Sequence, residues 1–426
     1  MKLTALSLLL LLLSNNGIAD SIRTSSPEKQ GVSSERLSRL EQLTQRYVDD
    51  GKLAGVITMV NRGGKLIHNE TVGFRGADDK RPLENDHLFR IYSMTKPIVA
   101  VAAMQLYEQG KFSLRDPISK YVPELKDVKV LNDEGKLVEP KRPITMHHLL
   151  THTAGFSYGF SPNNAIDKQY RAAQLFQAKN LTAFVEKLAQ LPLQYHPGEQ
   201  WHYSVAVDVT GLIVERLSGM PLDQYLEKNI FQPLGMTDTF FSVPADKMDR
   251  FLPNHYWDRK DESLKTIGAD AGGGAMSSYT DVTLFSGGGG LVSTAHDYMR
   301  FAEMLRAQGS FKGNQILSPK TVKFMTKDHL PKNTTVSGSG ENPLSQAFRG
   351  FGFGLGFGVI TDVVETQASG SEGSFMWGGA AGTIFWVDPE EDLVALCMIQ
   401  LMGSPWPLRE ELRILTYQAL TESLEE

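Results

Sequence analysis

The sequence predicts an α/β protein in which an antiparallel sheet flanked by helices is built from both ends of the chain, with a mostly helical lobe inserted between them. Segments of strand character cluster before residue 73 and after residue 350. Between residues 111 and 285, short helix-like pieces alternate with loops marked by proline and glycine. We therefore expect an α/β lobe at about 20–92 plus 287–426 and a helical lobe at about 93–286.

Residues 1–19 have the pattern of a secretory signal peptide. Lys2 provides a positive start, residues 3–13 are apolar, and Gly17-Ile18-Ala19 offers small residues for cleavage. The apolar run is too short to span a bilayer comfortably, and no later stretch is long and apolar enough to do so. The alternative is an uncleaved anchor. We expect a bacterial protein of the periplasm or the medium, with no transmembrane segment after signal removal.

Net charge and cysteine content bear on nucleic-acid binding and on disulfide bonding. The formal net charge of −6 gives no basic footprint for nucleic acid. Cys397, the only cysteine, lies in an apolar run, so it cannot form an internal disulfide and is expected to pack.

The first elements are predicted from capping and hairpin signals. Ser33 or Ser34 caps a helix that presents one apolar stripe and ends at Gly51. Residues 56–60 and 65–72 are two strands, and Gly63-Gly64 between them is a hairpin signal.

The later elements follow the same signals. In the central region, residues 182–188, with Thr182 as a possible cap, and 205–217 are expected to be helical, and the glycine-rich residues 268–274 are expected to form a loop. After Gly287, the sequence predicts a helix capped by Ser293 or Thr294 and running to 306, strands at 351–360, 373–377, 383–387 and 393–399, a turn at 388–392, and a closing helix at 408–420.

One helix, predicted to run from about Ser93 to Gly110, is apolar nearly all round and therefore buried. Pro97 fits only in its first turn, and Gly110 suits the residue just past its end. Ser93 then lies at a helix N-terminus, where free N–H groups favour negative charge. Lys96 lies one turn away on the same face.

A Ser-x-x-Lys arrangement is typical of acyl-transfer enzymes. Desolvation favours the neutral amine of a buried lysine, which can take the proton of a serine hydroxyl. The structural alternatives are an N-capping serine and a lysine that extends its amine to solvent. A second copy, Ser26-Pro27-Glu28-Lys29, lies in a polar stretch with no apolar helix behind it.

Two further segments supply candidate partners. Tyr203 immediately precedes the predicted helix at 205 and could share a proton with Lys96, or it could be a half-buried tyrosine with a structural role. Residues 375–383 form a strand that meets paired glycines, where a substrate can approach the backbone closely. The N–H of Ala380 could form an oxyanion hole with the N–H of Ser93, unless the segment is only a glycine-rich hairpin.

The chain resembles the β-lactamase and penicillin-binding serine hydrolase superfamily, in its class C-like branch, with most likeness to the family VIII carboxylesterases. Three motifs carry the resemblance over essentially the whole mature chain, residues 20–426: Ser93-Met94-Thr95-Lys96, Tyr203-Ser204-Val205 and Trp377-Gly378-Gly379. The resemblance implies the multi-lobed β-lactamase/DD-peptidase fold. It also implies that Ser93 is the acylated nucleophile and that Lys96 with Tyr203 is the base system. Substrate binding is expected at Trp377, Gly378, Gly379 and Ala380, with no cofactor.

Two departures from the lactamase pattern bear on the substrate. Val205 stands where that branch commonly has asparagine, and Trp377 replaces the strand lysine that binds a substrate carboxylate. Loss of that cation weakens anionic substrates, and the indole offers an apolar wall. Both changes favour neutral small-molecule esters.

Two local matches are expected to be unrelated to catalysis. Gly155-Phe156-Ser157-Tyr158-Gly159 matches the nucleophile elbow of α/β-hydrolases but lacks the strand before it and the helix after it, so Ser157 is expected in a loop. His148 and His152 have metal-ligand spacing, but Leu149 stands where the zinc-protease helix has glutamate. We expect a structural turn and no metal.

Three hypotheses remain at this point. The first is an exported serine esterase that forms an acyl-enzyme on Ser93. The second is a D-amino-acid-specific peptidase or weak β-lactamase on the same scaffold, which Trp377 and Val205 disfavour. The third is a non-catalytic binding protein, which intact Ser93, Lys96 and Tyr203 disfavour.

Overall fold

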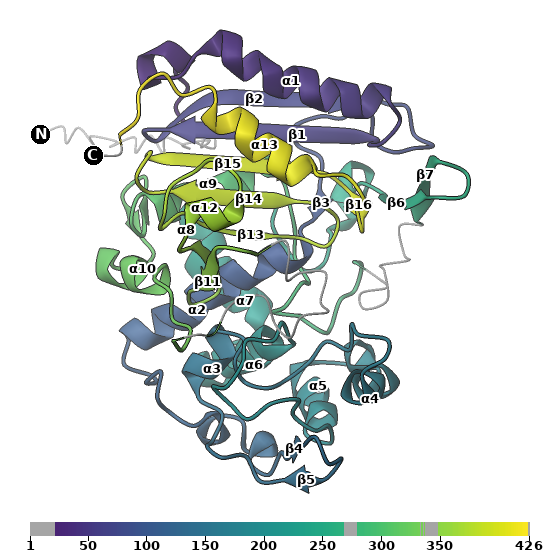
Figure 1. Cartoon of the computed structure of the whole chain (residues 1–426), viewed down its shortest axis with the longest axis vertical. Coiled ribbons are helices and arrows are strands. Elements are labelled where there is room, and N and C mark those ends of the chain that lie inside the picture. Colours follow the sequence, from purple (N-terminus) through teal and green to yellow (C-terminus); the bar gives the residue numbers. More distant parts are fainter. Residues whose placement is uncertain (1–21, 268–278, 333, 335, 337–347, 425–426) are drawn as a thin grey trace, which may run out of the picture.

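The computed structural model describes residues 22–267, 279–332, 334, 336 and 348–424 (Figure 1). Its centre is a seven-stranded sheet in which every neighbouring pair is antiparallel. In spatial order the strands are β11 (Phe351–Phe353), β12 (Gly358–Ile360), β13 (Phe375–Gly378), β14 (Ile384–Asp388), β15 (Leu393–Met398), β1 (Gly55–Arg62) and β2 (Lys65–Gly73). Segments from both ends of the chain therefore share one sheet, and the predicted antiparallel sheet is confirmed.

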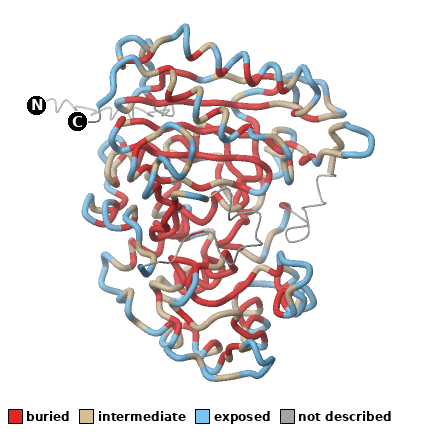
Figure 2. Tube along the Cα trace, in the orientation of Figure 1, coloured by how far each residue is buried: buried red, intermediate tan, exposed pale blue. Residues whose placement is uncertain are grey.

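Both faces of the sheet are covered by helices, which explains why its central strands are apolar without alternation. Along β14, Phe385 and Val387 belong to one core, and Ile384 and Trp386 belong to the other. The smaller core lies under α1 (Ser34–Asp49) and α13 (Leu408–Tyr417), and the larger contains α2 (Thr95–Glu108) and α9 (Ala295–Arg306). Figure 2 shows the buried trace running through the strands and α2.

The predicted caps and turns of these elements are confirmed. Ser33 caps α1 by accepting the N–H of Arg36 at 3.2 Å, and Thr294 caps α9. Gly63 and Gly64 have φ of +59° and +70°, the left-handed conformation that a two-residue hairpin turn requires. The lone Cys397 is buried and free, as expected.

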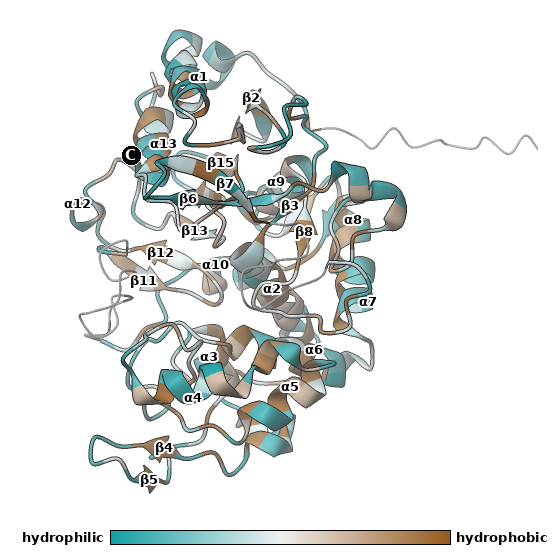
Figure 3. Ribbon diagram, turned by 90° about the vertical axis from the view of Figure 1, so that its right-hand side faces the viewer, coloured by the Kyte–Doolittle hydropathy of each residue, from teal (hydrophilic) through white to brown (hydrophobic). Residues whose placement is uncertain are grey.

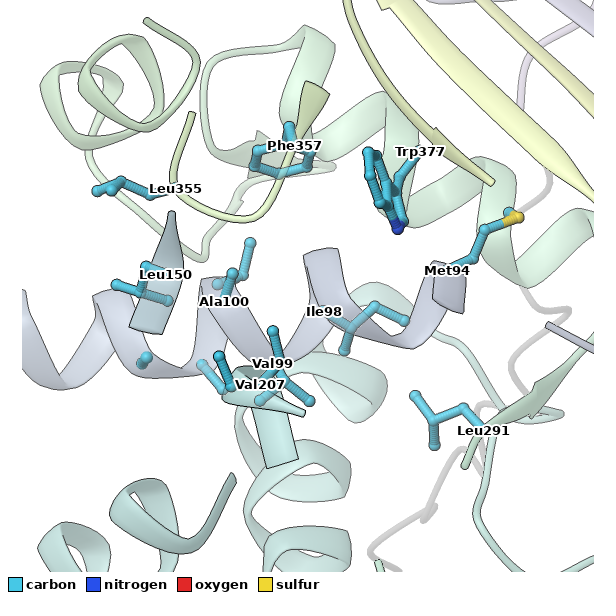
Figure 4. Packing of buried hydrophobic residues seen from close by; sticks show 14 of the residues in the cluster. Met94, Ile98, Val99, Ala100, Leu150, Val207, Leu291, Leu355, Phe357 and Trp377 are labelled. Carbon is cyan, nitrogen blue, oxygen red and sulfur yellow. The ribbon is translucent and has the colours of Figure 1, made fainter. Parts of the chain in front are cut away.

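Helix α2 crosses the middle of the molecule, between the sheet and the helical region that follows it in the chain (Figure 3). Residues from Thr95 to Met104 are all buried, so the helix is enclosed on every side. Its neighbours come from distant segments, among them Val207, Leu291 and Trp377 (Figure 4). Pro97 lies in the first turn, and Gly110 has φ of +69° just beyond the end.

The region that follows α2 is mostly helical, as predicted, and most of it lies in the lower half of Figure 1. It contains α3 (Met146–Leu150), α4 (Ala165–Ala173), α5 (Leu181–Leu188), α6 (Ala206–Ser218), α7 (Leu222–Leu226) and α8 (Gln232–Leu234), with a small hairpin of β4 (Val130–Leu131) and β5 (Leu137–Val138). Helix α5 is capped by Asn180, whose side chain accepts the N–H of Ala183, and the expectation of Thr182 as its cap is wrong.

Two strand features differ from the prediction. The segment 351–360 is not one strand, because β11 and β12 form a hairpin around Gly354 and Gly356; a Cβ on Gly354 would lie 2.2 Å from the carbonyl oxygen of Met325. A second sheet joins β6 (Asn254–Asp258) and β7 (Ser263–Ile267) to β16 (Leu401–Met402).

Other short elements of the described chain are β3 (Phe89–Arg90) with β8 (Val292–Ser293), β9 (Ser310–Phe311) with β10 (Asn314–Gln315), α10 (Pro319–Met325) and α12 (Val363–Thr366). The expected leader at 1–19 and the expected loop at 268–274 lie outside the described residues. The lobe boundaries stay a prediction. Among the described helices, none combines the length and the apolar character needed to cross a bilayer.

Candidate active site

Ser93 lies in a short 3₁₀ turn, Tyr92–Met94, that leads directly into α2. Tyr92 and Met94 are buried, whereas Ser93 is partly exposed, so its hydroxyl is the group of this turn that a substrate can reach. Tyr92 has φ of +43°, a conformation that is strained for a bulky residue. Its hydroxyl accepts a hydrogen bond from Asn254 Nδ2 at 2.8 Å, which helps to hold the turn.

Lys96 is enclosed, with only 1% of its surface exposed. Its Nζ donates to Ser93 Oγ at 3.2 Å and to the carbonyl oxygen of Gly288 at 2.6 Å. The same Nζ lies 4.5 Å from the ring centre of Tyr203 and 5.1 Å from that of Tyr158. Within the described part of the chain, Lys96 has no carboxylate at salt-bridge distance, so Ser93 Oγ, the Gly288 carbonyl and these two rings are its immediate surroundings.

Tyr203 is brought to Lys96 by the turn before α6, as its position in the sequence suggested. Lys96 Nζ contacts the face of the Tyr203 ring, and no hydrogen bond joins Lys96 Nζ to the Tyr203 hydroxyl among the described residues. The hydroxyl instead accepts a long hydrogen bond from Trp377 Nε1 at 3.4 Å. Hydrogen bonds of this kind often shorten only when substrate is bound.

The strand β13 brings the third motif beside the serine. A Cβ on Gly379 would lie 2.5 Å from the carbonyl oxygen of Ile91 and 2.2 Å from Thr383 Oγ1, so this close approach requires glycine. Arg409 donates to the carbonyl oxygens of Gly379 and Thr383 at 2.6 and 2.9 Å, which holds the turn after β13.

The two N–H groups expected to form an oxyanion hole are free to serve a ligand. Within the described residues, neither the N–H of Ser93 nor that of Ala380 donates a hydrogen bond. Ala380 is exposed, next to Gly379. The structure thus gathers Ser93, Lys96, Tyr203, Trp377 and the 378–380 segment in one place.

A buried carboxylate, Asp208, adds a feature that motif reasoning missed. Its Oδ1 accepts from Ser286 Oγ at 2.5 Å and from the N–H of Gly288 at 3.0 Å. Its Oδ2 has no partner among the described residues. Burial raises the pKa of Asp208, and the nearby charge of Lys96 opposes this rise. The sequence did contain a signal for this residue, because Asp208 is a carboxylate in the otherwise apolar first turn of α6.

Gly288 connects Asp208 to the lysine. A Cβ at Gly288 would lie 2.5 Å from Asp208 Oδ2 and 2.6 Å from the Tyr158 hydroxyl, so those two groups converge on one point. Burial raises the pKa of Tyr158 well above its usual value, and the charge of Asp208 adds to this. Asp208 thus holds the Gly288 backbone, whose carbonyl oxygen accepts a hydrogen bond from Lys96 Nζ.

Ser157 lies in a loop, as expected, without the strand and helix of an elbow. Its hydroxyl donates to Asp167 and accepts the N–H of Gly159 at 3.0 Å, while Asp167 also accepts the N–H of Ser161 at 2.7 Å. These bonds close the loop and give Ser157 a structural role.

His148 and His152 have different surroundings. The His148 side chain accepts the N–H of Thr145 as part of a capping box. His152 is buried with its ring centre 4.9 Å from that of Tyr203, and burial, followed by the charge of Lys96, lowers its pKa well below the usual value. Neutral His152 is therefore part of the packing behind Tyr203.

Aromatic side chains extend from these residues to the surface. The Tyr158 ring stacks on Phe160 at 5.0 Å, and Phe160 is 68% exposed. On the other side, Trp377 stacks on Phe348 at 5.2 Å. The surroundings of Ser93 are therefore rich in apolar rings.

Comparisons with known proteins identify the family of this chain. The β-lactamase family model matches residues 40–418. The chain belongs to the β-lactamase family. An uncharacterized protein of Mycobacterium tuberculosis is 39% identical over 360 residues, covering 83% of this chain and 87% of that protein. Esterase EstB of Burkholderia gladioli is 29% identical, covering 89% of this chain and 95% of EstB.

Among solved structures, EstCE1, described as a hydrolase with promiscuous acyltransferase activity, superposes with a TM-score of 0.76 at 26% identity, covering 91% of this chain and 99% of that one. The resemblance drawn from the motifs and the expected fold are therefore confirmed. The chain is a hydrolase of the β-lactamase fold whose relatives include esterases.

Proposed function

We propose that this protein hydrolyses neutral carboxylic esters through an acyl-enzyme on Ser93. The observation that carries this proposal is the 3.2 Å hydrogen bond between Lys96 Nζ and Ser93 Oγ inside an aromatic enclosure. Similarity to EstB and EstCE1 supports the ester as substrate class.

The reaction follows from the positions of these groups. In its neutral form Lys96 takes the Ser93 hydroxyl proton while Oγ attacks the ester carbonyl carbon. The N–H groups of Ser93 and Ala380 stabilise the resulting oxyanion. The bond to the alcohol then breaks, and the leaving alkoxide takes the proton, through Tyr203 or directly. A water molecule then gives a proton to the same amine and attacks the acyl carbonyl carbon. The bond from this carbon to Ser93 Oγ breaks, Oγ takes the proton back from Lys96, and the carboxylic acid leaves.

The aromatic surroundings favour a neutral ester over an anionic substrate. A β-lactam and a D-Ala-D-Ala peptide each carry a carboxylate, which the lactamase branch binds with a lysine on this strand. In this chain the buried indole of Trp377 on β13 takes the place of that lysine. A lost charge-assisted hydrogen bond costs roughly 1.5–3 kcal/mol, which is on the order of tenfold or more in recognition. A neutral ester loses nothing there.

We expect kcat/KM to rank p-nitrophenyl butyrate at least about tenfold above nitrocefin and above a D-Ala-D-Ala peptide. The three substrates should be compared at neutral pH with purified protein, and the Ser93→Ala variant serves as the control for activity of contaminants. Faster turnover of the cephalosporin or the peptide than of the butyrate would place the peptidase or β-lactamase hypothesis first.

We also propose that the protein is exported, on the pattern of residues 1–19. Expression with this leader in a Gram-negative host should place esterase activity in the periplasm or the medium. Leu8→Arg with Leu9→Arg interrupts the apolar run and should keep the activity in the cytoplasm. Equal distributions of the two forms would refute export by this segment.

A further inference from the structure

A pocket of about 500 Å³ lies beside the first turn of α3 and the end of α10. This volume is in the range of sites for small molecules. Three segments form its wall, at residues 114–115, 142–148 and 324–329, and none of the candidate catalytic residues lies among them. The pocket is therefore a separate feature of the fold.

Two arginines, Arg115 and Arg142, are among the residues that line this pocket. The guanidinium groups of Arg115 and Arg142 have neither a salt bridge nor a side-chain hydrogen bond among the described residues, and both residues are exposed. Asp116, next to Arg115 in the chain, is paired with Lys120 at 3.3 Å. The two arginines thus present their charge to the pocket.

A histidine donor converges with one of them. Two donor atoms converge beside Gly198. A Cβ atom added at Gly198 would lie 3.4 Å from Arg142 Nη1 and 2.9 Å from His148 Nε2. His148 Nδ1 accepts the N–H of Thr145 at 3.2 Å, which assigns the ring proton to Nε2. Burial, with the charge of Arg142, lowers the pKa of His148 to about 4. At neutral pH this ring therefore adds a neutral N–H donor beside the guanidinium.

Flat rings also line the pocket. The ring centre of His329 lies 5.4 Å from that of His147 and 4.7 Å from that of Phe324. His329 Nε2 donates to the carbonyl oxygen of Phe324 at 2.8 Å, which fixes the orientation of this ring. Phe324 is 41% exposed, so apolar ring surface is available to a ligand.

We propose that this pocket binds a small organic anion that carries an aromatic ring. Arg115 and Arg142 hold the anionic group, because a guanidinium matches the planar oxygens of a carboxylate or phosphate. The aromatic group contacts the rings of His329 and Phe324. This inference does not depend on the reaction proposed at Ser93.

Binding can be measured by calorimetry and by NMR of the histidine rings at low salt, with benzoate, phenyl phosphate and benzamide as probes. We expect at least one of the two anions to bind about tenfold or more tightly than neutral benzamide, because benzamide lacks the charge. Tighter binding of benzoate assigns the pocket to carboxylates, and tighter binding of phenyl phosphate assigns it to phosphate monoesters.

The location of binding is read from the chain's ten histidines, assigned by single His→Gln variants. We expect the ring NMR signals of His147, His148 and His329 to shift when the anion binds. Shifts confined to His152 and His202 would place the anion near Tyr203 instead and overturn it.

A matched pair of variants tests the arginines. Arg115→Gln with Arg142→Gln should weaken binding of the anion about tenfold or more. Arg259→Gln with Lys260→Gln removes the same charge from the exposed β6–β7 turn and should leave the affinity unchanged. Equal affinities of the two double variants, or of benzoate, phenyl phosphate and benzamide, would show that the pocket does not recognise anions.

Discussion

Ser93→Ala should lower kcat/KM for p-nitrophenyl butyrate by at least about a thousandfold while leaving the fold intact. Removal of the nucleophile leaves only substrate binding and the oxyanion donors, and the loss in comparable serine hydrolases is about a millionfold in kcat. A fluorophosphonate probe, followed by peptide mass analysis, should label Ser93 in the unaltered protein.

Ser157→Ala is the matched control for this prediction. It removes a buried hydroxyl that closes a loop through Asp167 and Gly159, so it should cost about 1–3 kcal/mol in the free energy of unfolding. Most of the esterase activity should remain when the variant is assayed at a temperature below its own, lowered melting temperature. Labelling of Ser157 by the probe would show that the nucleophile has been assigned wrongly.

Lys96→Ala and Tyr203→Phe should each lower kcat by about a hundredfold or more. The kcat of the double variant should be only a little below that of the less active single variant. Groups that move one proton together lose activity non-additively. Their contact, with Nζ 4.5 Å from the ring centre, makes such coupling physically possible.

The measurement is a double-mutant cycle on kcat for a butyrate ester, with circular dichroism to verify folding. Tyr256→Phe, a half-exposed tyrosine on β6, provides a control hydroxyl deletion and should have little effect. If the two losses multiply in folded variants, Lys96 and Tyr203 act independently and the shared role is refuted.

The lysine also depends on groups that no local pattern joins to it. Its amine binds the carbonyl oxygen of Gly288, and the N–H of Gly288 is held by Asp208. Each bond spans a long stretch of sequence, so the backbone that receives Lys96 exists only after α2, α6 and the 286–290 segment have packed together.

Where a feature depends on neighbours in the chain, the sequence alone determined it. Ser93 and Lys96 meet because three residues make nearly one helical turn, and Gly63-Gly64 forms a hairpin because both residues accept positive φ. The enclosure of α2 follows from a helix with no polar face, and belonging to the β-lactamase family was predicted from three motifs in order.

Only the tertiary structure decided features that depend on contacts between distant segments. The strand expected at 351–360 is two strands, because Gly354 approaches the carbonyl of Met325 too closely for a side chain and the chain reverses there. Tyr203 presents its ring face rather than its hydroxyl to Lys96, and Asp208 and Tyr158 converge beside Gly288. Such arrangements depend on how buried surfaces of separate elements fill space, and neither residue type nor spacing along the chain encodes that packing.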